Sequence, residues 1–160
     1  MSPLITEKLV ILSLDSPDRH AATRMLAENL AEEGRVTDLE GFLATLRERE
    51  NQKSTGISGG VSIPHARSSY VTEPSLAFGR SPQGVEWGAE DGPAKLIFLI
   101  AAPLDEGRER FTIRASKPAG SWVLAALARR LMHTSFRRSL MDAPDPTAVV
   151  DIVTQEVVNA

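Results

Sequence analysis

The sequence predicts a single α/β domain built on a mixed sheet of about five strands. Segments with the helical spacing of apolar residues occur before, between and after short apolar runs that are typical of strands. The 160 residues suffice for one domain with a substantial core and are too few for two of ordinary size. No linker composition and no internal repeat divides the chain, so we expect residues 1–160 to fold as one domain.

The chain is expected to begin with a strand or apolar lead-in at residues 9–14, followed by a helix over residues 17–33. Ser16 offers an N-cap for this helix, and Pro17 suits its first position because an N–H there would have no helical partner. Gly34 is expected to end the helix, since glycine readily adopts the left-handed conformation common just past a helix C-terminus.

A second helix is expected after the capping box that runs from Thr37 to Glu40. The apolar face of this helix carries Leu39, Phe42, Leu43 and Leu46. Polar and glycine residues then replace the helical periodicity over residues 51–60, which predicts a loop.

The second half of the chain predicts the remaining strands and helices. Short strands are expected at residues 61–63, 75–79, 85–87 and 95–101. The run from Leu96 to Ala102 is the longest uninterrupted apolar segment and indicates a strand buried on both faces. Residues 104–120 are charged and irregular, which predicts an atypical surface insertion. Helices are expected over residues 122–131, after a cap at Thr134, and from Pro146 onward.

Composition argues against several classes of function. The formal net charge of -3 does not favour a nucleic-acid binder, whose surface is strongly basic. The chain has no cysteine, which excludes thiol nucleophiles and cysteine-based zinc sites. No secretory signal is visible, and the longest apolar run is far shorter than the ~20 residues that cross a bilayer. We therefore expect a cytoplasmic protein without direct membrane insertion.

The histidines are the first candidates for chemistry. Of the three, His20 and His133 fall on a helix and at a helix end, where surface positions are expected. His65 differs because it follows a glycine-rich loop, a short strand and Pro64. Proline holds the preceding residue extended and cannot donate to a sheet, so the strand should finish there. His65 is thus expected at the carboxyl end of a strand, where open α/β sheets place their ligand sites.

The loop before His65 is suited to an anion. It contains Gly56, Gly59 and Gly60, whose backbone N–H groups can approach an anion closely because no Cβ intervenes. These residues suit an imidazole that carries a phosphoryl group, and they suit equally a plain turn followed by a strand exit. The loop lacks the spacing of a nucleotide-binding P-loop, and the histidines lack metal-ligand spacing. We expect no metal site and no cofactor.

Several short segments together resemble one known family. They are residues 34–38, 41–43, 47–50, 54–57, 63–66, 73–75, 91–92, 98–103, 127–129 and 136–137, with Ile63-Pro64-His65-Ala66 at their centre. In order and spacing they are similar to the EIIA domain of the bacterial sugar phosphotransferase system. The similarity is to the fructose/mannitol class, which also includes the nitrogen-regulatory EIIA proteins.

This resemblance implies a fold, a reaction and partners. The fold would be a mixed sheet flanked by helices on both faces. His65 would accept a phosphoryl group from phospho-HPr and donate it to an EIIB component for sugar uptake. Arg49 matches the family arginine that lies over the active site. HPr and EIIB would be the partners, and we expect the protein itself to be a monomer or a weak homodimer.

A phosphoryl group on His65 would bring roughly two negative charges that need compensation. Arg49 offers a planar guanidinium fork that matches phosphoryl oxygens. Further phosphoryl ligands are expected from hydroxyls and loop N–H groups: Ser54, Thr55, Gly59, Gly60 and Ser62.

The sequence departs from the family pattern at Ser58, Gly59 and Ser62, which are small residues that the loop can absorb, and by a missing second histidine, which keeps another function open. Ser62 stands where members usually have alanine. Many members also carry a second histidine shortly after the segment that ends at Pro103, and residues 104–120 contain none. The alternatives are a nitrogen-regulatory type that acts by phosphorylation-dependent protein binding, and a degenerate member that no longer transfers phosphate.

Overall fold

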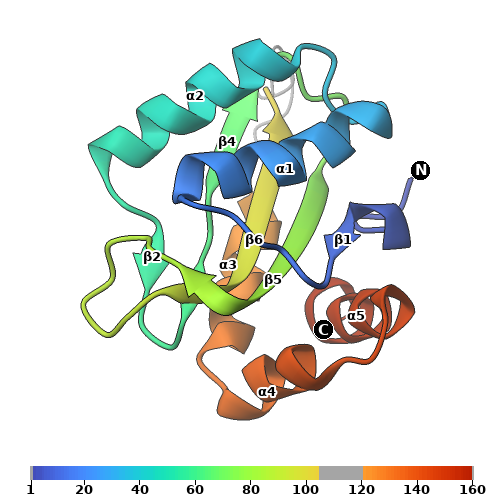
Figure 1. The fold of residues 1–160 in the computed structure, drawn as a ribbon. Helices are drawn as coiled ribbons and strands as arrows, with labels where there is room; N and C mark the ends of the chain where they lie inside the picture. Colours follow the sequence, from blue (N-terminus) through green and yellow to red (C-terminus); the bar gives the residue numbers. More distant parts are fainter. Residues whose placement is uncertain (1, 105–120, 160) are drawn as a thin grey trace.

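The computed structural model describes residues 2–104 and 121–159 (Figure 1). The predicted surface insertion at residues 104–120 lies outside these residues except for Leu104, which is exposed. The structural statements that follow concern the described residues.

A six-stranded mixed sheet forms the centre of the fold, in place of the expected five or so strands. Its strands are β1 (Val10–Ile11), β2 (Gly56–Ile57), β3 (Val61–Ser62), β4 (His65–Ser68), β5 (Ser75–Val85) and β6 (Ala94–Pro103). The order is β1-β5-β6-β3-β2, with β4 also paired to β6. β5 and β6 are antiparallel, whereas β3 and β4 both run parallel to β6. The mixed sheet is confirmed.

Helices cover both faces of the sheet, as the resemblance implied (Figure 1). The helices are α1 (Arg19–Glu32), α2 (Leu39–Gln52), α3 (Ser121–Leu131), α4 (Thr134–Asp142) and α5 (Pro146–Val153), with short turns at Glu7–Leu9 and Thr154–Val158. In Figure 1, α1 and α2 lie in front of the sheet and α3 lies behind it. α1 packs on β5, α2 packs on β4, and α3 and α4 contact β6.

The apolar run in β6 is buried along its length, which confirms the predicted buried strand. All residues from Leu96 to Ala102 are buried, and the rings of Phe78 and Phe98 pack with centroids 5.2 Å apart. Fully burying a side chain of this size stabilises a fold by roughly 1.5–3 kcal/mol. β6 is therefore held firmly in the core, and its hydrogen bonds fix the positions of the strands that pair with it.

The helix caps differ from those expected. α1 is capped by Asp18, whose Oδ1 accepts a hydrogen bond from the Ala21 N–H at 2.8 Å, while Ser16 donates to the Asp18 carbonyl instead. A carboxylate also interacts favourably with the positive end of the helix dipole, which favours aspartate over serine here. Gly34 does end the segment with a φ of +75°.

The later caps shift in the same way. Asp38 rather than Thr37 caps α2, because the Thr37 hydroxyl donates to the Tyr70 carbonyl. At α4 the N-cap position belongs to His133, and Thr134 is the first helical residue.

Two strand predictions were also incomplete. The strand expected at residues 75–79 continues to Val85 as β5, with an irregularity between Arg80 and Val85. Of the strand expected at residues 85–87, Glu86 and Trp87 lie beyond the end of β5. β4 was missed because Pro64 breaks the ladder between β3 and β4. The Pro64 carbonyl nevertheless accepts a hydrogen bond from the Ile100 N–H at 2.9 Å, so the chain stays against β6 across the break.

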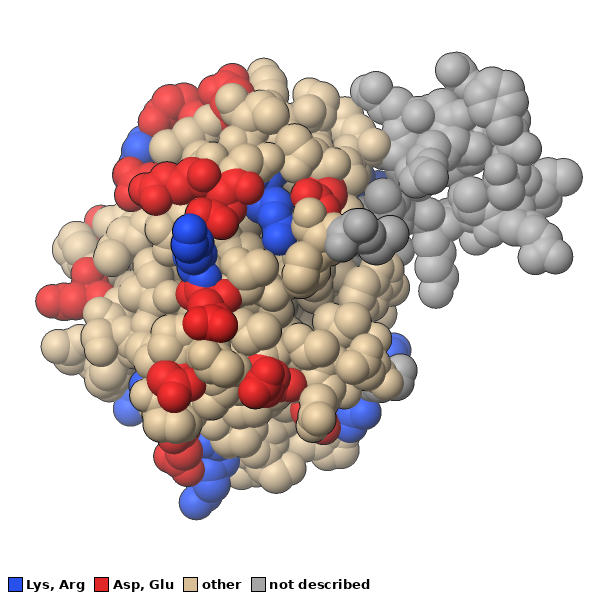
Figure 2. Space-filling model, turned by 90° about the vertical axis from the view of Figure 1, so that its right-hand side faces the viewer, with Lys and Arg blue, Asp and Glu red and all other residues tan. Residues whose placement is uncertain are grey.

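The surface has no strongly basic character on the face drawn in Figure 2. Acidic side chains predominate there, with a few lysines and arginines among them. That face offers no surface of the kind that binds nucleic acid.

Arg80 ties the end of α4 to the sheet. Its Nη1 donates to the carbonyls of Leu140, Met141 and Ala143 at 2.9, 3.1 and 2.8 Å. The last carbonyls of a helix have no partner within it, so these bonds satisfy them. We expect Arg80→Met to lower the free energy of unfolding by about 2–4 kcal/mol, measured by urea denaturation. The exposed Arg138→Met should change it by less than about 0.5 kcal/mol, and equal losses would contradict this role.

Candidate active site

His65 lies at a strand start rather than at the strand end that the sequence predicts. It is the first residue of β4 and pairs in register with Ile100 of β6. Pro64 separates it from β3, so the expected strand does finish where proline predicts. The His65 side chain is half-buried, which leaves part of the ring open to an approaching group.

Two contacts fix the imidazole ring of His65. Its Nδ1 lies 2.7 Å from the carbonyl oxygen of Ile63, and its Nε2 lies 3.3 Å from Nη2 of Arg49. A carbonyl oxygen only accepts and a guanidinium only donates. We therefore assign the proton to Nδ1, which leaves the lone pair on Nε2. Nε2 is therefore the ring nitrogen whose lone pair could act as a nucleophile.

Arg49 reaches His65 from the last turn of α2. It is half-buried, and the packing of α2 on β4 brings these residues together although they are 16 positions apart in the chain. A guanidinium carries several N–H donors in one plane, and the contact with Nε2 uses one of them. The others can hold oxygens of a group placed on the ring.

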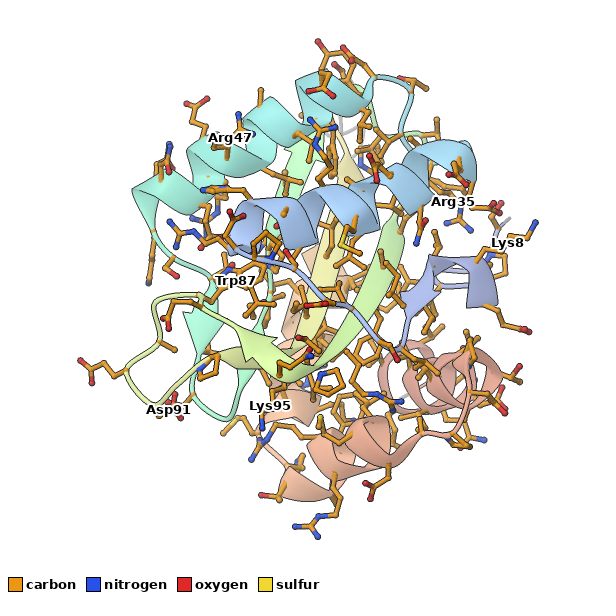
Figure 3. The ribbon with its side chains drawn as sticks, viewed as in Figure 1. Lys8, Arg35, Arg47, Trp87, Asp91 and Lys95 are labelled. Atoms are coloured by element: carbon orange, nitrogen blue, oxygen red, sulfur yellow. The ribbon has the colours of Figure 1, made fainter. Side chains whose placement is uncertain are left out.

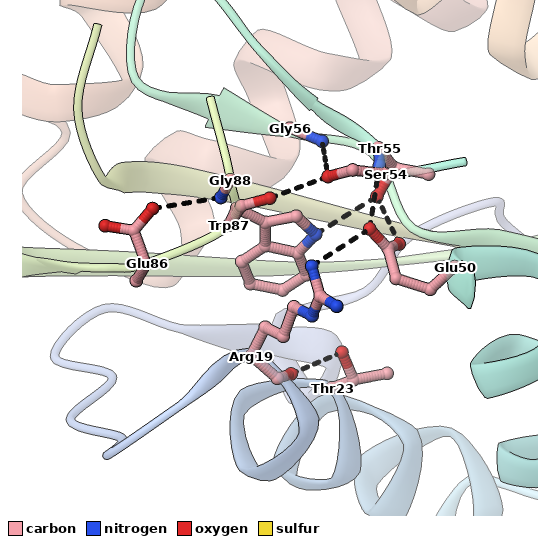
Figure 4. A network of polar contacts seen from close by, with 9 residues as sticks. All are labelled: Arg19, Thr23, Glu50, Ser54, Thr55, Gly56, Glu86, Trp87 and Gly88. Carbon is pink, nitrogen blue, oxygen red and sulfur yellow. Dashed lines mark hydrogen bonds and ion pairs between the residues drawn. The ribbon is translucent and has the colours of Figure 1, made fainter. Parts of the chain in front are cut away.

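The predicted hydroxyl ligands Ser54 and Thr55 have partners of their own. Ser54 donates to the Trp87 carbonyl at 2.6 Å. The Thr55 hydroxyl donates to Glu50 at 2.7 Å and accepts from the Trp87 indole N–H at 3.1 Å (Figure 4). We call Glu50, Thr55 and Trp87 the Glu50 network; all its members are buried. Both hydroxyls are therefore engaged in hydrogen bonds within the protein, and they support the site rather than point to a ligand.

The predicted loop ligands Gly59 and Gly60 are both in the left-handed region, with φ of +93° and +74°. The Gly59 N–H donates to Asp91 Oδ2 at 3.0 Å, and the Gly60 carbonyl accepts from Lys95 N–H at 2.7 Å. Asp91 and Lys95 are both labelled in the lower part of Figure 3. Gly59 also approaches Arg137 of α4 so closely that an added Cβ would lie 3.1 Å from its Nε. The tip of the loop is therefore fixed by contacts with Asp91, with Lys95 of β6 and with Arg137 of α4.

Ser62 is fully buried, and its hydroxyl has no hydrogen-bond partner in the described part of the chain. A buried hydroxyl without a partner costs about 1–3 kcal/mol. We expect Ser62→Ala to raise the free energy of unfolding by about 1 kcal/mol, measured by denaturant titration.

Ser68 of β4 provides the matched control. It is also buried, but its Oγ accepts a hydrogen bond from the Tyr70 N–H at 3.0 Å. Ser68→Ala should therefore lower the free energy of unfolding by about 1 kcal/mol. A loss of similar size in Ser62→Ala would show that the Ser62 hydroxyl is satisfied.

Two residues of this region were not found from the sequence. The structure shows that Glu50 is only 8% exposed. In the sequence it belongs to four residues of alternating charge, Arg47 to Glu50, a pattern typical of a solvent-exposed helix end. Trp87 is 1% exposed and belongs to no motif. The chain has only two tryptophans, and a large aromatic side chain of this kind is often buried. That was the one feature of the sequence that could have pointed to Trp87.

The described residues contain no group of three or more histidine, aspartate or glutamate side chains arranged to hold a metal ion. Within residues 2–104 and 121–159, no helix has the length and apolar character needed to cross a membrane.

Comparison with known sequences gives a consistent family. Residues 3–156 match the family described as phosphoenolpyruvate-dependent sugar phosphotransferase system, EIIA 2. A fructose-specific EIIA component of Haloferax volcanii is 35% identical over 152 residues, which cover 93% of this chain and 92% of that protein. A fructose-specific EIIABC component of Bacillus subtilis is 33% identical; the match covers 97% of this chain and 23% of that protein.

Solved structures with the same fold include regulatory and sugar-specific proteins. The nitrogen regulatory protein IIA-Ntr of Neisseria meningitidis superimposes with a TM-score of 0.77 and 27% identity, covering 94% of this chain and 97% of that one. The mannitol IIA of Escherichia coli gives a TM-score of 0.71 at 21% identity, over 92% of this chain and 97% of that one, and shows the shared fold.

Proposed function

The chain belongs to the EIIA 2 family of the phosphoenolpyruvate-dependent sugar phosphotransferase system, and we propose that His65 is its phosphoryl carrier, loaded by phospho-HPr and discharged to an EIIB component. The observation that carries this proposal is the pair of contacts on the His65 ring. The Ile63 carbonyl holds the proton on Nδ1 at 2.7 Å, and Arg49 stands 3.3 Å from the free Nε2. The phosphoryl group is therefore proposed to reside on Nε2.

The transfer is an exchange of one bond to phosphorus for another. The Nε2 lone pair attacks phosphorus on phospho-HPr, and the bond between phosphorus and the donor group of HPr breaks. The Nδ1 proton stays on the ring, where the Ile63 carbonyl stabilises the positive charge that develops there. Attack by the EIIB acceptor then breaks the Nε2–phosphorus bond and returns the neutral imidazole. Such a reaction depends mainly on positioning and charge compensation.

Arg49 supplies the compensating charge. In the unloaded protein one N–H points at the Nε2 lone pair, which phosphorus takes over on loading. The guanidinium then faces the phosphoryl oxygens, and its parallel N–H groups can bind two of them. A cation already placed at the site loses little entropy when the dianion arrives.

The relatives support a role in sugar uptake. The Haloferax and Bacillus proteins are named fructose-specific, and the name of the latter joins the A, B and C components in one protein. That arrangement supports transfer to an EIIB component, and the proposal keeps the cytoplasmic location expected from the sequence. The likeness to IIA-Ntr favours, as a second function, regulation by binding other proteins according to phosphorylation state.

The test is reconstitution with Enzyme I, HPr and labelled phosphoenolpyruvate, followed by mapping of an acid-labile phosphate. We expect label on His65 and its transfer to an added EIIB of the fructose type. Label that stays on the chain in the presence of EIIB would favour the regulatory function. No label at all would reject the phosphocarrier and leave the degenerate member.

A further inference from the structure

We propose that Glu50 is a positioning residue whose buried carboxylate sets the tautomer of His65 and its distance from Arg49. The inference rests on the proposed function for its effect on transfer. Its structural part concerns the ring alone and can be measured separately.

The Glu50 carboxylate accepts two hydrogen bonds from Thr55 and lies near the guanidinium of Arg19. Its Oε2 accepts from the Thr55 N–H at 2.8 Å, and its Oε1 accepts from the Thr55 hydroxyl at 2.7 Å. Arg19 Nη1 lies 3.9 Å from Oε2 and balances the charge (Figure 4). A carboxylate that is 8% exposed would be costly without such donors. Glu50 thereby locks the last turn of α2 onto the segment that leads into β2.

A chain of hydrogen bonds runs from this carboxylate to the ring. The Thr55 carbonyl accepts from the Ile63 N–H at 3.0 Å, and the Ile63 carbonyl lies 2.7 Å from His65 Nδ1. The contact of Arg49 with Nε2 closes the chain, because Arg49 directly precedes Glu50 in α2. Both nitrogens of the ring therefore depend on groups that Glu50 fixes.

Trp87 also fixes Thr55, the residue that donates to Glu50. Its indole N–H donates to the Thr55 hydroxyl at 3.1 Å, and that hydroxyl in turn donates to Glu50. Its carbonyl accepts from Ser54 at 2.6 Å, and its Cβ would lie 3.0 Å from a Cβ added at Gly56. The Thr55 hydroxyl is thus both donor and acceptor, which gives the Glu50 network a single arrangement.

Glutamine at position 50 keeps the shape of the side chain and changes its hydrogen bonding. An amide presents one accepting oxygen and one NH₂ group, so one of the two Thr55 donors loses its acceptor. The Thr55 carbonyl then shifts relative to Ile63, and the hydrogen bond that Nδ1 donates to the Ile63 carbonyl weakens. Once this bond weakens, the ring proton can occupy Nε2, where it removes the lone pair that attacks phosphorus.

The test compares Glu50→Gln with Glu48→Gln, an exposed neighbour with the same charge change. Ring ¹⁵N NMR reports the tautomer of His65 in the folded protein, and single-turnover mixing with phospho-HPr reports the loading rate. We expect Glu50→Gln to populate the Nε2–H tautomer and to load at least ~10-fold more slowly, with Glu48→Gln unchanged in both. A wild-type tautomer and rate in Glu50→Gln, with only a lower melting temperature, would overturn the inference.

If Glu50→Gln does not fold, a second pair of variants at Thr55 tests the same role. Thr55→Val keeps the N–H bond and removes the hydroxyl, whereas Thr55→Ser restores it. We expect the valine variant to shift the tautomer in the same direction and the serine variant to recover it. Equal tautomers in the two would contradict the role of the Glu50 network. If the wild-type chain takes no label, the proposed function fails, but the NMR comparison still decides the positioning role.

Discussion

Replacing His65 with alanine is expected to abolish loading by phospho-HPr while the fold stays intact. Nε2 of this ring is the nitrogen beside a guanidinium, and no other group described in the structure has the same pair of contacts. His20 and His133 are exposed. The backbone of residue 65 would still pair with β6, so the loss of two ring contacts should cost about 1–3 kcal/mol of stability.

The measurement is the stoichiometry of acid-labile label from phosphoenolpyruvate in the presence of Enzyme I and HPr. His20→Ala serves as the control, because it removes an exposed imidazole from α1 and should load fully. A thermal melt of each variant separates loss of chemistry from loss of fold. Label on His65→Ala equal to that on His20→Ala would show that another residue carries the phosphate.

The sequence predicted the elements whose signals are local. α1, α2 and β6 follow from periodicity and from an apolar run, which neighbouring residues alone determine. β4 could not be predicted in this way, because its four residues pair with β6 some 35 positions later and a proline stands before them. Its pairing depends on β6 being already buried, which is a property of the assembled sheet.

The site residues also differ in whether their signals are local in the sequence. The glycine loop and Pro64 made His65 a candidate, although it lies at the start of β4 rather than at a strand end, and the resemblance added Arg49. The partners of Ser54 and Thr55 could not be predicted, because Trp87 comes more than thirty residues later and competes for both hydroxyls. A hydroxyl near a candidate histidine is thus free to bind phosphate only if the fold brings it no nearer acceptor.

The Ile63-Pro64-His65 segment explains how so short a motif orients a ring. Proline fixes its own φ and keeps Ile63 extended, so the carbonyl of Ile63 and the side chain two residues later have a narrow range of relative positions. The bond of 2.7 Å between that carbonyl and Nδ1 lies within this range. The motif thus brings the Ile63 carbonyl to Nδ1, the Glu50 network holds that carbonyl in place through Thr55, and Arg49 supplies the charge at Nε2.

That charge is tested by Arg49→Ala, which we expect to slow loading by at least ~10-fold while the protein stays folded. The ring of His65 keeps its carbonyl partner and its lone pair, so attack on phosphorus still occurs, but the phosphoryl oxygens lose their guanidinium. Arg47→Ala is the matched control, because Arg47 is exposed on α2 two residues earlier (Figure 3). It removes the same charge from the same helix.

Single-turnover rates with phospho-HPr distinguish local from general electrostatics. Surface charges steer the association of two proteins, and this contribution falls as salt is added. If Arg49 acts on the phosphoryl group itself, the deficit of Arg49→Ala persists at high salt, whereas any deficit of Arg47→Ala disappears. Arg49→Lys should recover only part of the rate, since an ammonium is a point charge without the planar fork. Equal rates for the two alanine variants at high salt would remove Arg49 from the mechanism.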